Sequence, residues 1–235
     1  MNIYEITPFS LLDFPGEVAC IVWVSSCNLR CVYCHNPDVV LKKGTKTEED
    51  LFDFLNKRTG KLSAVVFSGG EATLASDITD VIRRVKSMGF KVKLDTNGAL
   101  PDVISSLLSD NLLDSVALDF KAPDYKISSV VGSQINPEFV SNFWQSCDLL
   151  IQHSKLNPLF SFEIRTTLSP DILSEEDIAS MMSALDEVSY SGTYWLQNIV
   201  SFGEKTLGSI APASRLFDKA KLPKPSKFSL GFRNF

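Results

Sequence analysis

The sequence predicts an α/β fold in which parallel strands form a partial, splayed (β/α)6 barrel of the TIM type. Six apolar, β-branched segments alternate with amphipathic helical segments, and the connections between them are short. Such alternation is typical of a parallel sheet covered by helices. Polar residues follow five successive strands, which favours a sheet curved around one central site over an open sheet that binds ligands at a single switch point.

The expected strands are residues 18–25, 64–68, 91–95, 115–119, 160–166 and, more weakly, 193–200. The expected helices are residues 47–57, 76–88, 102–108, 137–151 and 174–187. Two of these helices begin with a capping-box pattern, Thr47 with Asp50 and Ser174 with Asp177, which satisfies free backbone groups at a helix start. We expect one catalytic domain over residues 1–203, with residues 204–235 as a basic extension of the same domain.

Composition places the chain among ordinary globular proteins, with 235 residues, 44% hydrophobic and 22% charged. No stretch reaches the roughly 18 uncharged apolar residues of a membrane helix, and the first residues lack the basic region of a secretory signal. We therefore expect a soluble, cytoplasmic protein that binds no membrane. The net charge of −5 argues against nucleic-acid binding, although residues 204–235 alone carry a net charge of +5.

Three of the five cysteines, Cys27, Cys31 and Cys34, follow the first expected strand with the spacing C-x3-C-x2-C. An odd cysteine count in a cytoplasmic chain indicates metal or redox chemistry rather than a disulfide framework. Such a loop can bind three corners of an iron–sulfur cube and leave one iron without a protein thiolate. A zinc site completed by Cys20 or Cys147 is the alternative, although both are expected in the hydrophobic core.

Further polar residues lie where the other expected strands end, at the edge where parallel α/β folds bind ligands. They are Gly69, Gly70 and Glu71 after the second strand, Asp95 after the third, Asp119 and Lys121 after the fourth, and Arg165 near the end of the fifth. Each also has a purely structural interpretation. The glycines can form a turn, the aspartates can cap loops, and the two cations can form salt bridges with the two aspartates.

These segments together resemble the radical S-adenosylmethionine enzymes. The resemblance lies in CNLRCVYCHNP (27–37), SGGEATL (68–74), DTNG (95–98) and LDFK (118–121). With TPFSLLDFPG (7–16), the finer resemblance is to glycyl-radical-enzyme activating enzymes, and most of all to the activating protein of anaerobic ribonucleoside-triphosphate reductase.

The resemblance extends over about residues 11–200, most of the chain. Two positions depart from the family pattern, because Ser26 stands where glycine is common and Ala72 where proline is common. Neither departure removes a ligand. No segment after residue 200 matches a family motif, and no additional cysteines are present for a second cluster.

The resemblance implies a 4Fe–4S cluster whose protein ligands are Cys27, Cys31 and Cys34. The amino and carboxylate groups of S-adenosylmethionine would then chelate the fourth iron. Gly69, Gly70 and Glu71 would bring backbone polar groups to the amino end of this cofactor, since glycine allows the backbone a close approach.

The resemblance also assigns roles to the charged residues at the strand ends. Asp95 and Asp119 would lie beside the cofactor and can help to hold a monovalent cation. Lys121 and Arg165 would pair with the carboxylate or the ribose hydroxyls of the cofactor, and Lys121 joins the three cysteines as a candidate catalytic residue. Asn36, with its neighbour His35, would donate hydrogen bonds around the cysteine loop. His153, at a helix end, is expected to be structural.

The implied reaction starts with one electron from reduced flavodoxin or ferredoxin and cleaves S-adenosylmethionine to methionine and a 5′-deoxyadenosyl radical. That radical would take a hydrogen atom from a glycine of a glycyl radical enzyme, foremost anaerobic ribonucleotide reductase. Three alternatives stay open. They are an activase of a pyruvate formate-lyase type enzyme, a radical enzyme acting on a small molecule, and a non-catalytic zinc or electron-transfer module.

The basic tail is expected to run over the surface, because Pro212, Pro223 and Pro225 interrupt it. Four phenylalanines are interleaved with its lysines and arginines, a pattern typical of protein interfaces. They are Phe217, Phe228, Phe232 and Phe235. The tail is therefore a candidate docking surface for the partner enzyme. Alternatively, the phenylalanines cover the base of the barrel or an exposed sheet edge.

The cysteine assignment predicts the outcome of an anaerobic purification. We expect a brown protein with about four irons per chain, as one 4Fe–4S cluster requires. Cys31→Ala should lose the cluster absorbance and S-adenosylmethionine cleavage, whereas the matched control Cys20→Ala should keep both. A colourless protein with one zinc, or full activity of Cys31→Ala, would contradict the assignment.

Overall fold

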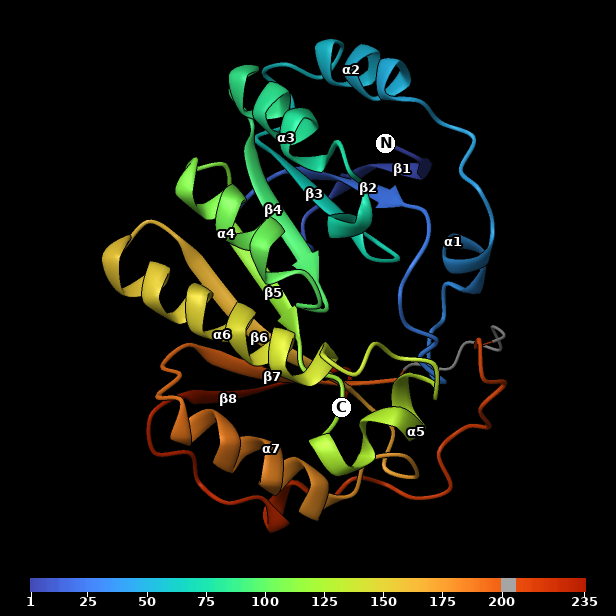
Figure 1. Ribbon diagram of the computed structural model, residues 1–235, viewed down its shortest axis with the longest axis vertical. Coiled ribbons are helices and arrows are strands. Elements are labelled where there is room, and N and C mark those ends of the chain that lie inside the picture. Colours follow the sequence, from blue (N-terminus) through green and yellow to red (C-terminus); the bar gives the residue numbers. More distant parts are fainter. Residues whose placement is uncertain (200–205) are drawn as a thin grey trace.

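The computed structural model describes residues 1–199 and 206–235, which form one eight-stranded sheet whose strand order follows the chain (Figure 1). All six expected strands are present and run parallel. They are β2 (Ala19–Val24), β3 (Ala64–Gly69), β4 (Lys91–Thr96), β5 (Ser115–Asp119), β6 (Ser161–Leu168) and β7 (Thr193–Asn198). The expected end of the last strand at residue 200 lies outside the described residues.

Two further strands extend the sheet beyond the six that the sequence predicts. β1 (Ile3–Ser10) pairs antiparallel with β2, and β8 (Ser229–Arg233) pairs parallel with β7. The alternation of strands and helices does not predict β1, because no helix separates it from β2, nor β8, which is short and follows a proline-rich stretch. Within the described residues the sheet does not close, so the partial-barrel prediction is confirmed and its strand count is corrected.

The longer helices cover the outer, convex side of the curved sheet, whereas the short α1 (Pro37–Leu41) and α5 (Ile127–Val131) do not lie on that side (Figure 1). The α-helices are α1 (Pro37–Leu41), α2 (Glu48–Asn56), α3 (Ile78–Ser87), α4 (Pro101–Ser109), α5 (Ile127–Val131), α6 (Phe139–Leu156) and α7 (Glu175–Glu187). Three short 3-10 turns are η1 (Ala72–Leu74), η2 (Asp124–Lys126) and η3 (Lys219–Lys221). Both predicted capping boxes are present, at the starts of α2 and α7.

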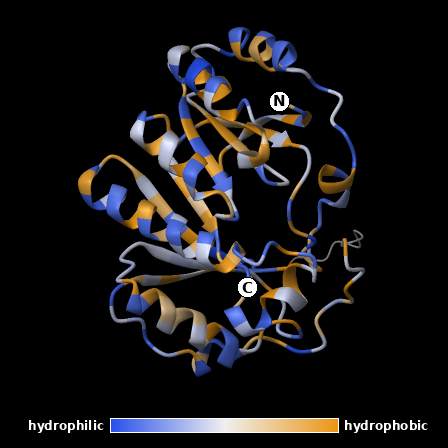
Figure 2. Ribbon diagram, in the orientation of Figure 1, coloured by the Kyte–Doolittle hydropathy of each residue, from blue (hydrophilic) through white to orange (hydrophobic). Residues whose placement is uncertain are grey.

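The two faces of the sheet have different chemistry. The main core lies between the sheet and the outer helices, whose hydrophobic residues alternate with hydrophilic ones (Figure 2). Inside the curve, Phe14 from the loop after β1 packs with Ala19, Ile21, Ala64 and Val66 of β2 and β3. This loop therefore covers part of the inner face, and the rest of that face is left for polar side chains.

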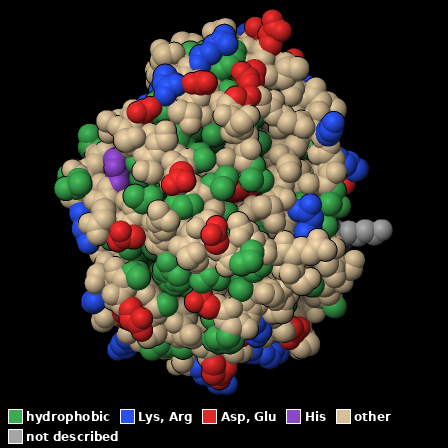
Figure 3. All heavy atoms as spheres, viewed as in Figure 1, with side chains coloured by type: hydrophobic (Ala, Val, Ile, Leu, Met, Phe, Trp, Pro, Cys, Tyr) green, Lys and Arg blue, Asp and Glu red, His purple; other side chains and the backbone are tan. Residues whose placement is uncertain are grey.

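On the face drawn in Figure 3, acidic and basic side chains are interspersed rather than gathered by sign. Among the described residues, none of the helices combines the length and apolar character needed to cross a bilayer.

The tail is attached to the body of the protein at several points along its length. Arg215 forms a two-pronged ion pair with Glu175 at the start of α7, with N–O distances of 2.7 and 2.8 Å. Phe228 is only 7% exposed and lies beside the rings of Tyr190 and Tyr194. The expected surface-running course is found over residues 211–227, most of which are exposed, whereas Phe228 and β8 cover the core and the edge of the sheet.

The remaining tail predictions are not settled by this placement. The ammonium of Lys219 lies over the rings of Phe232 and Phe235, and Phe235 is 45% exposed. Docking through these rings stays a prediction. So does the predicted division of the chain, because its boundary between residues 203 and 204 lies outside the described residues.

The buried position of Phe228 predicts that the tail is needed for folding. Phe228→Ala should lower the free energy of unfolding by about 3–5 kcal/mol, because it leaves a cavity beside Tyr190 and Tyr194. Phe235→Ala, the matched control, should lower it by less than about 1 kcal/mol. Deleting residues 213–235 should give an insoluble protein, because it also exposes the β7 edge. Urea unfolding checks the point variants, and a soluble, cooperatively folding truncation would contradict the prediction.

Candidate active site

A cavity of about 300 Å³ lies at the edge of the sheet where the parallel strands end. All the candidate residues from the sequence line it: Cys27, Cys31, Cys34, His35, Asn36, Gly69, Gly70, Glu71, Asp95, Asp119, Lys121 and Arg165. A larger hollow of about 640 Å³ borders Met1, Ser25 and Asp77 and contains none of these residues. We place the site in the smaller cavity because the chemically active groups converge there.

The cysteine loop is held in place by backbone hydrogen bonds from both sides. The amides of Arg30 and Val32 donate to carbonyls at the end of α5, at 2.7 and 2.9 Å. From the other side, the amides of Leu207 and Gly208 donate to the carbonyls of Cys34 and Val32, at 2.8 and 2.9 Å. A Cβ at Gly208 would lie 2.7 Å from the Val32 carbonyl oxygen, so this approach requires glycine. Sequence reasoning missed this contact because residues 207–208 match no motif.

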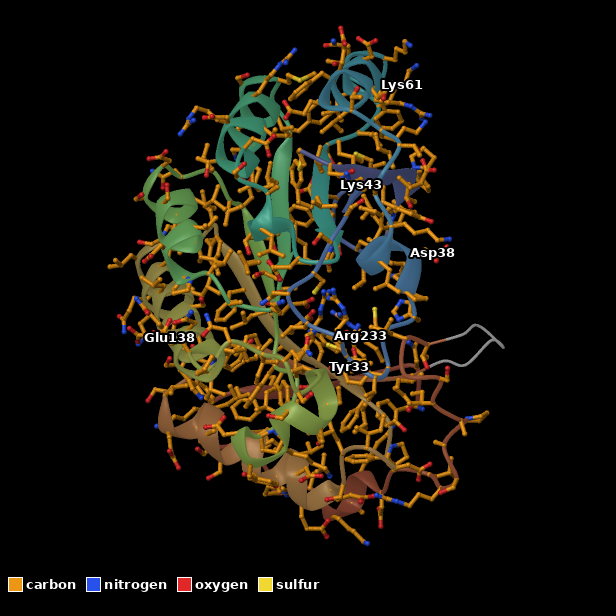
Figure 4. All side chains as sticks on the ribbon, turned by 45° about the vertical axis from the view of Figure 1, so that its right-hand side comes forward. Tyr33, Asp38, Lys43, Lys61, Glu138 and Arg233 are labelled. Carbon is orange, nitrogen blue, oxygen red and sulfur yellow. The ribbon has the colours of Figure 1, made fainter. Side chains whose placement is uncertain are left out.

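The thiols of this loop lie in a largely water-free environment. Burial raises the pKa of Cys27 to about 12 and also raises the pKa of Cys31. In the metal-free protein these thiols are therefore protonated at neutral pH, and metal binding must release their protons. Tyr33, between Cys31 and Cys34, has a buried hydroxyl without a hydrogen-bond partner among the described residues. Figure 4 shows Tyr33 in the interior, where a bound group could use that hydroxyl.

The two cysteines that would complete a zinc site lie away from the thiols of the loop. In residues 1–199 and 206–235, no three His, Cys, Asp or Glu side chains are placed as ligands of one metal ion. A 4Fe–4S cluster does not require such convergence, because each iron takes one thiolate. Cys20 and Cys147, which would complete the zinc alternative, are buried in the core and do not line the cavity.

The side chain of Glu71 ties two loops of the site together. It is 1% exposed, and its Oε1 accepts hydrogen bonds from the Thr73 and Thr96 hydroxyls at 2.6 and 2.7 Å. Its Oε2 accepts from the Asn97 amide at 2.7 Å. Burial raises the pKa of Glu71, although these donors oppose the shift. The side chain is thus structural, and the backbone role expected of the Gly-Gly-Glu segment stays a prediction.

Close backbone packing joins the Gly-Gly-Glu segment to the cysteine loop. Gly69 has a φ of +121°, a conformation that favours glycine. A Cβ at Gly70 would lie 1.8 Å from the carbonyl oxygen of Ser26, which precedes Cys27. In addition, the Asn97 side-chain amide donates to the Asn28 side-chain oxygen at 2.8 Å. Three loops of the site are therefore locked to one another.

The charged residues form a paired array on the inner face of the sheet. Arg165 pairs through Nε with Asp119 and through its NH2 group with Asp95, the latter at 3.2 Å. Lys121 Nζ lies 2.8 Å from the second oxygen of Asp119. Burial alone would raise the pKa of Asp119. The positive charges and hydrogen bonds of Arg165 and Lys121 outweigh burial and lower this pKa to about 2. The salt bridges that the sequence predicted between these cations and aspartates are confirmed.

Comparison with known proteins identifies the family. Residues 21–153, more than half of the chain, match the family model described as the radical SAM superfamily. The chain belongs to the radical SAM superfamily. A protein of Methanocaldococcus jannaschii, provisionally described as a glycyl-radical enzyme activating enzyme, is 35% identical over 187 residues, which cover 77% of this chain and 74% of that protein.

Two further proteins share a shorter region or only the fold with this chain. The pyruvate formate-lyase-activating enzyme of Clostridium pasteurianum is 34% identical over 132 residues, which cover 52% of this chain and 53% of that enzyme. The chain thus spans about half the length of this relative. SuiB of Streptococcus suis, in a crystal structure with the precursor peptide SuiA, has a TM-score of 0.60 at 16% identity, over 81% of this chain and 41% of that one.

Membership in this superfamily implies a 4Fe–4S cluster and S-adenosylmethionine, so the chain is an enzyme of the radical SAM type. The cavity fits these groups. It offers three thiols on one tethered loop, a wall of closely packed glycine backbone, and cations that remain charged when buried. Cys27, Cys31 and Cys34 would hold the cluster, as the sequence predicts.

The hydrogen bonds of Glu71 predict that the stability of the fold depends on its carboxylate group and not only on the volume of its side chain. Glu71→Gln should lower the free energy of unfolding by about 2 kcal/mol, because an amide group would face backbone or hydroxyl donors. Glu49→Gln on the exposed start of α2 is the matched control and should change it by less than about 0.5 kcal/mol. Chemical unfolding measures both. Equal stability of Glu71→Gln and the wild type would show that this network is not structural.

Proposed function

We propose that this enzyme generates a glycyl radical on a partner enzyme and that the partner is an anaerobic ribonucleoside-triphosphate reductase. The observation that carries the proposal is the convergence of the cysteine loop, the Gly-Gly-Glu segment and the paired charges on one cavity. The 35% identity to a relative of the activating type over three-quarters of the chain supports the activase class. The preference for the reductase rests on the segments at residues 7–16 and 27–37.

When bound, the cluster and S-adenosylmethionine supply a one-electron cleavage that yields methionine and a 5′-deoxyadenosyl radical. The electron comes from a reduced flavodoxin or ferredoxin. That chemistry would move a hydrogen atom from a glycine Cα of the partner to the 5′ carbon and leave 5′-deoxyadenosine and a glycyl radical. The radical chemistry belongs to the cofactor, and the protein supplies binding, orientation and exclusion of water.

The chain's own residues account for these protein tasks. Lys121 and Arg165, which stay charged inside the cavity, would pair with the carboxylate or ribose hydroxyls of the cofactor. Asn36 lines the same cavity and would donate a hydrogen bond near the cysteine loop. Because Asp119 and Asp95 fix both cations in advance, little reorganisation is needed when the cofactor binds.

The open shape of the sheet supports the proposal that the substrate is a macromolecule. β1 and β8 are the two edges of the sheet and do not pair with each other. The inner side of the half barrel is therefore not closed by a strand, which would allow a segment of a partner to approach the cavity. The cytoplasmic location and the single catalytic domain belong to this proposal as predictions.

A second candidate is activation of a pyruvate formate-lyase type enzyme. It is favoured by the 34% identity to the pyruvate formate-lyase-activating enzyme of Clostridium pasteurianum. The cavity does not distinguish between the two candidate partner enzymes, because the residues that line it would bind the cofactor that both reactions use. The distinction must come from the surface that receives the partner.

The proposal predicts which partner acquires the radical. The anaerobically reconstituted enzyme, a chemical reductant and S-adenosylmethionine should produce a glycyl-radical electron paramagnetic resonance signal on anaerobic ribonucleotide reductase. A glycine-to-alanine variant of the reductase is the control and should give none. A radical on pyruvate formate-lyase alone would overturn the choice of partner. Cleavage of S-adenosylmethionine without a radical on either protein would favour a small-molecule substrate.

A further inference from the structure

The carboxylates expected to hold a monovalent cation already face groups of the protein. One oxygen of Asp119 pairs with Arg165 Nε, and the other lies 2.8 Å from Lys121 Nζ. Oδ2 of Asp95 lies 3.2 Å from the Arg165 guanidinium and accepts a hydrogen bond from the Ser68 hydroxyl at 3.0 Å. Three of the four carboxylate oxygens are thus occupied by cationic or hydroxyl groups.

The fourth oxygen, Asp95 Oδ1, faces a lysine that the sequence analysis did not single out. It is buried and has no directed hydrogen bond within the described residues, but Lys93 Nζ lies 3.1 Å away. Lys93 is two residues before Asp95 on β4, so both side chains point to the inner face of the sheet. A monovalent cation bound to Asp95 Oδ1 would have to share that position with an ammonium group, and like charges repel.

Lys93 is held firmly in this position. Its side chain is 3% exposed, and Nζ donates to the carbonyl oxygen of Asp13, in the loop after β1, at 2.6 Å. On its other side, Nζ lies 3.9 Å from Glu163 on β6. Arg233 of β8 pairs with both oxygens of Glu163, at 2.8 and 3.3 Å, and stacks over the Trp195 ring.

The cations and carboxylates of this array pair with one another. Lys93, Arg165 and Lys121 carry three positive charges against the two negative charges of Asp95 and Asp119. The Glu163–Arg233 pair adds no net charge. The two aspartates are therefore paired by cations of the protein itself, while Asp13 and Glu71 add two further carboxyl groups to the lining of the cavity.

We infer that Lys93 takes the place of a monovalent cation beside Asp95, and that the enzyme binds S-adenosylmethionine without an alkali ion. Lys93 is then a positioning residue, which holds the Asp95 carboxylate and contributes charge to the cavity. The expected cation does not fit the donor set of this chain. The inference rests on the cofactor binding that the proposed function requires, and it is independent of the partner's identity.

Equilibrium binding of S-adenosylmethionine to the cluster-loaded full chain tests the inference. Anaerobic calorimetry would compare choline chloride, sodium chloride and potassium chloride at equal ionic strength. We expect the wild-type Kd to differ by less than about twofold among the three salts, since the internal charge does not depend on the salt. A Kd that rises about tenfold in choline chloride, the loss expected when a coupled ion is removed, would overturn the inference.

Variants of the two lysines on β4 add a second measurement. Lys93→Met should raise the Kd about tenfold in choline chloride, and sodium or potassium should restore part of the affinity. Lys93→Arg, which keeps the charge, should bind more tightly than Lys93→Met. Lys91→Met is the matched control, because Lys91 is exposed and pairs with Glu17 at the surface. Its Kd should equal that of the wild type.

The outcomes separate the inference from the proposed function. Normal affinity of Lys93→Met in choline chloride would overturn the role of Lys93. No binding of S-adenosylmethionine in any salt would overturn the proposed function and the inference with it. If Lys93→Met does not fold, the wild-type comparison among the three salts still decides whether an alkali ion is needed.

Discussion

The pairing of Arg165 with Asp95 and Asp119 is the interaction on which the inner face of this half barrel depends. Placing an ion inside a protein costs several kcal/mol unless a partner compensates it. Two carboxylates can lie on the concave side of the sheet only because Arg165 bridges them and Lys93 and Lys121 face their outer oxygens. Burial of the array strengthens these pairs, so the site keeps its charges at neutral pH.

The same strands serve two environments because their side chains alternate between the faces of the sheet. In β4, Val92 and Leu94 are fully buried beneath the outer helices, whereas Lys93 and Asp95 point into the half barrel. Fully parallel strands are usually apolar on both faces. Here the inner face is charged toward the carboxyl ends of the strands, and the loop after β1 supplies Phe14 to cover its apolar part.

The cysteine loop depends on segments that are distant in sequence. It has no helix or strand of its own, and backbone bonds from the end of α5 and from residues 207–208 hold it. The tail therefore supports the site in two ways, through these contacts and through β8, which brings Arg233 to Glu163. A segment without any family motif is thereby part of the body that positions the cysteine loop.

The sequence by itself determined the features that depend on local pattern. Periodicity predicts the six strands, and helix-start chemistry predicts both capping boxes. The geometry of parallel strands predicts that the site residues gather at one edge of the sheet. These are the cysteine loop, the glycines, Asp95, Asp119, Lys121 and Arg165. Only the tertiary structure decided that β1 and β8 extend the sheet, that Glu71 joins two loops, and that Lys93 faces Asp95 while Glu163 pairs with Arg233. These contacts depend on the register between strands and on loops that cross the sheet, and no local pattern of residues encodes which distant side chains will meet.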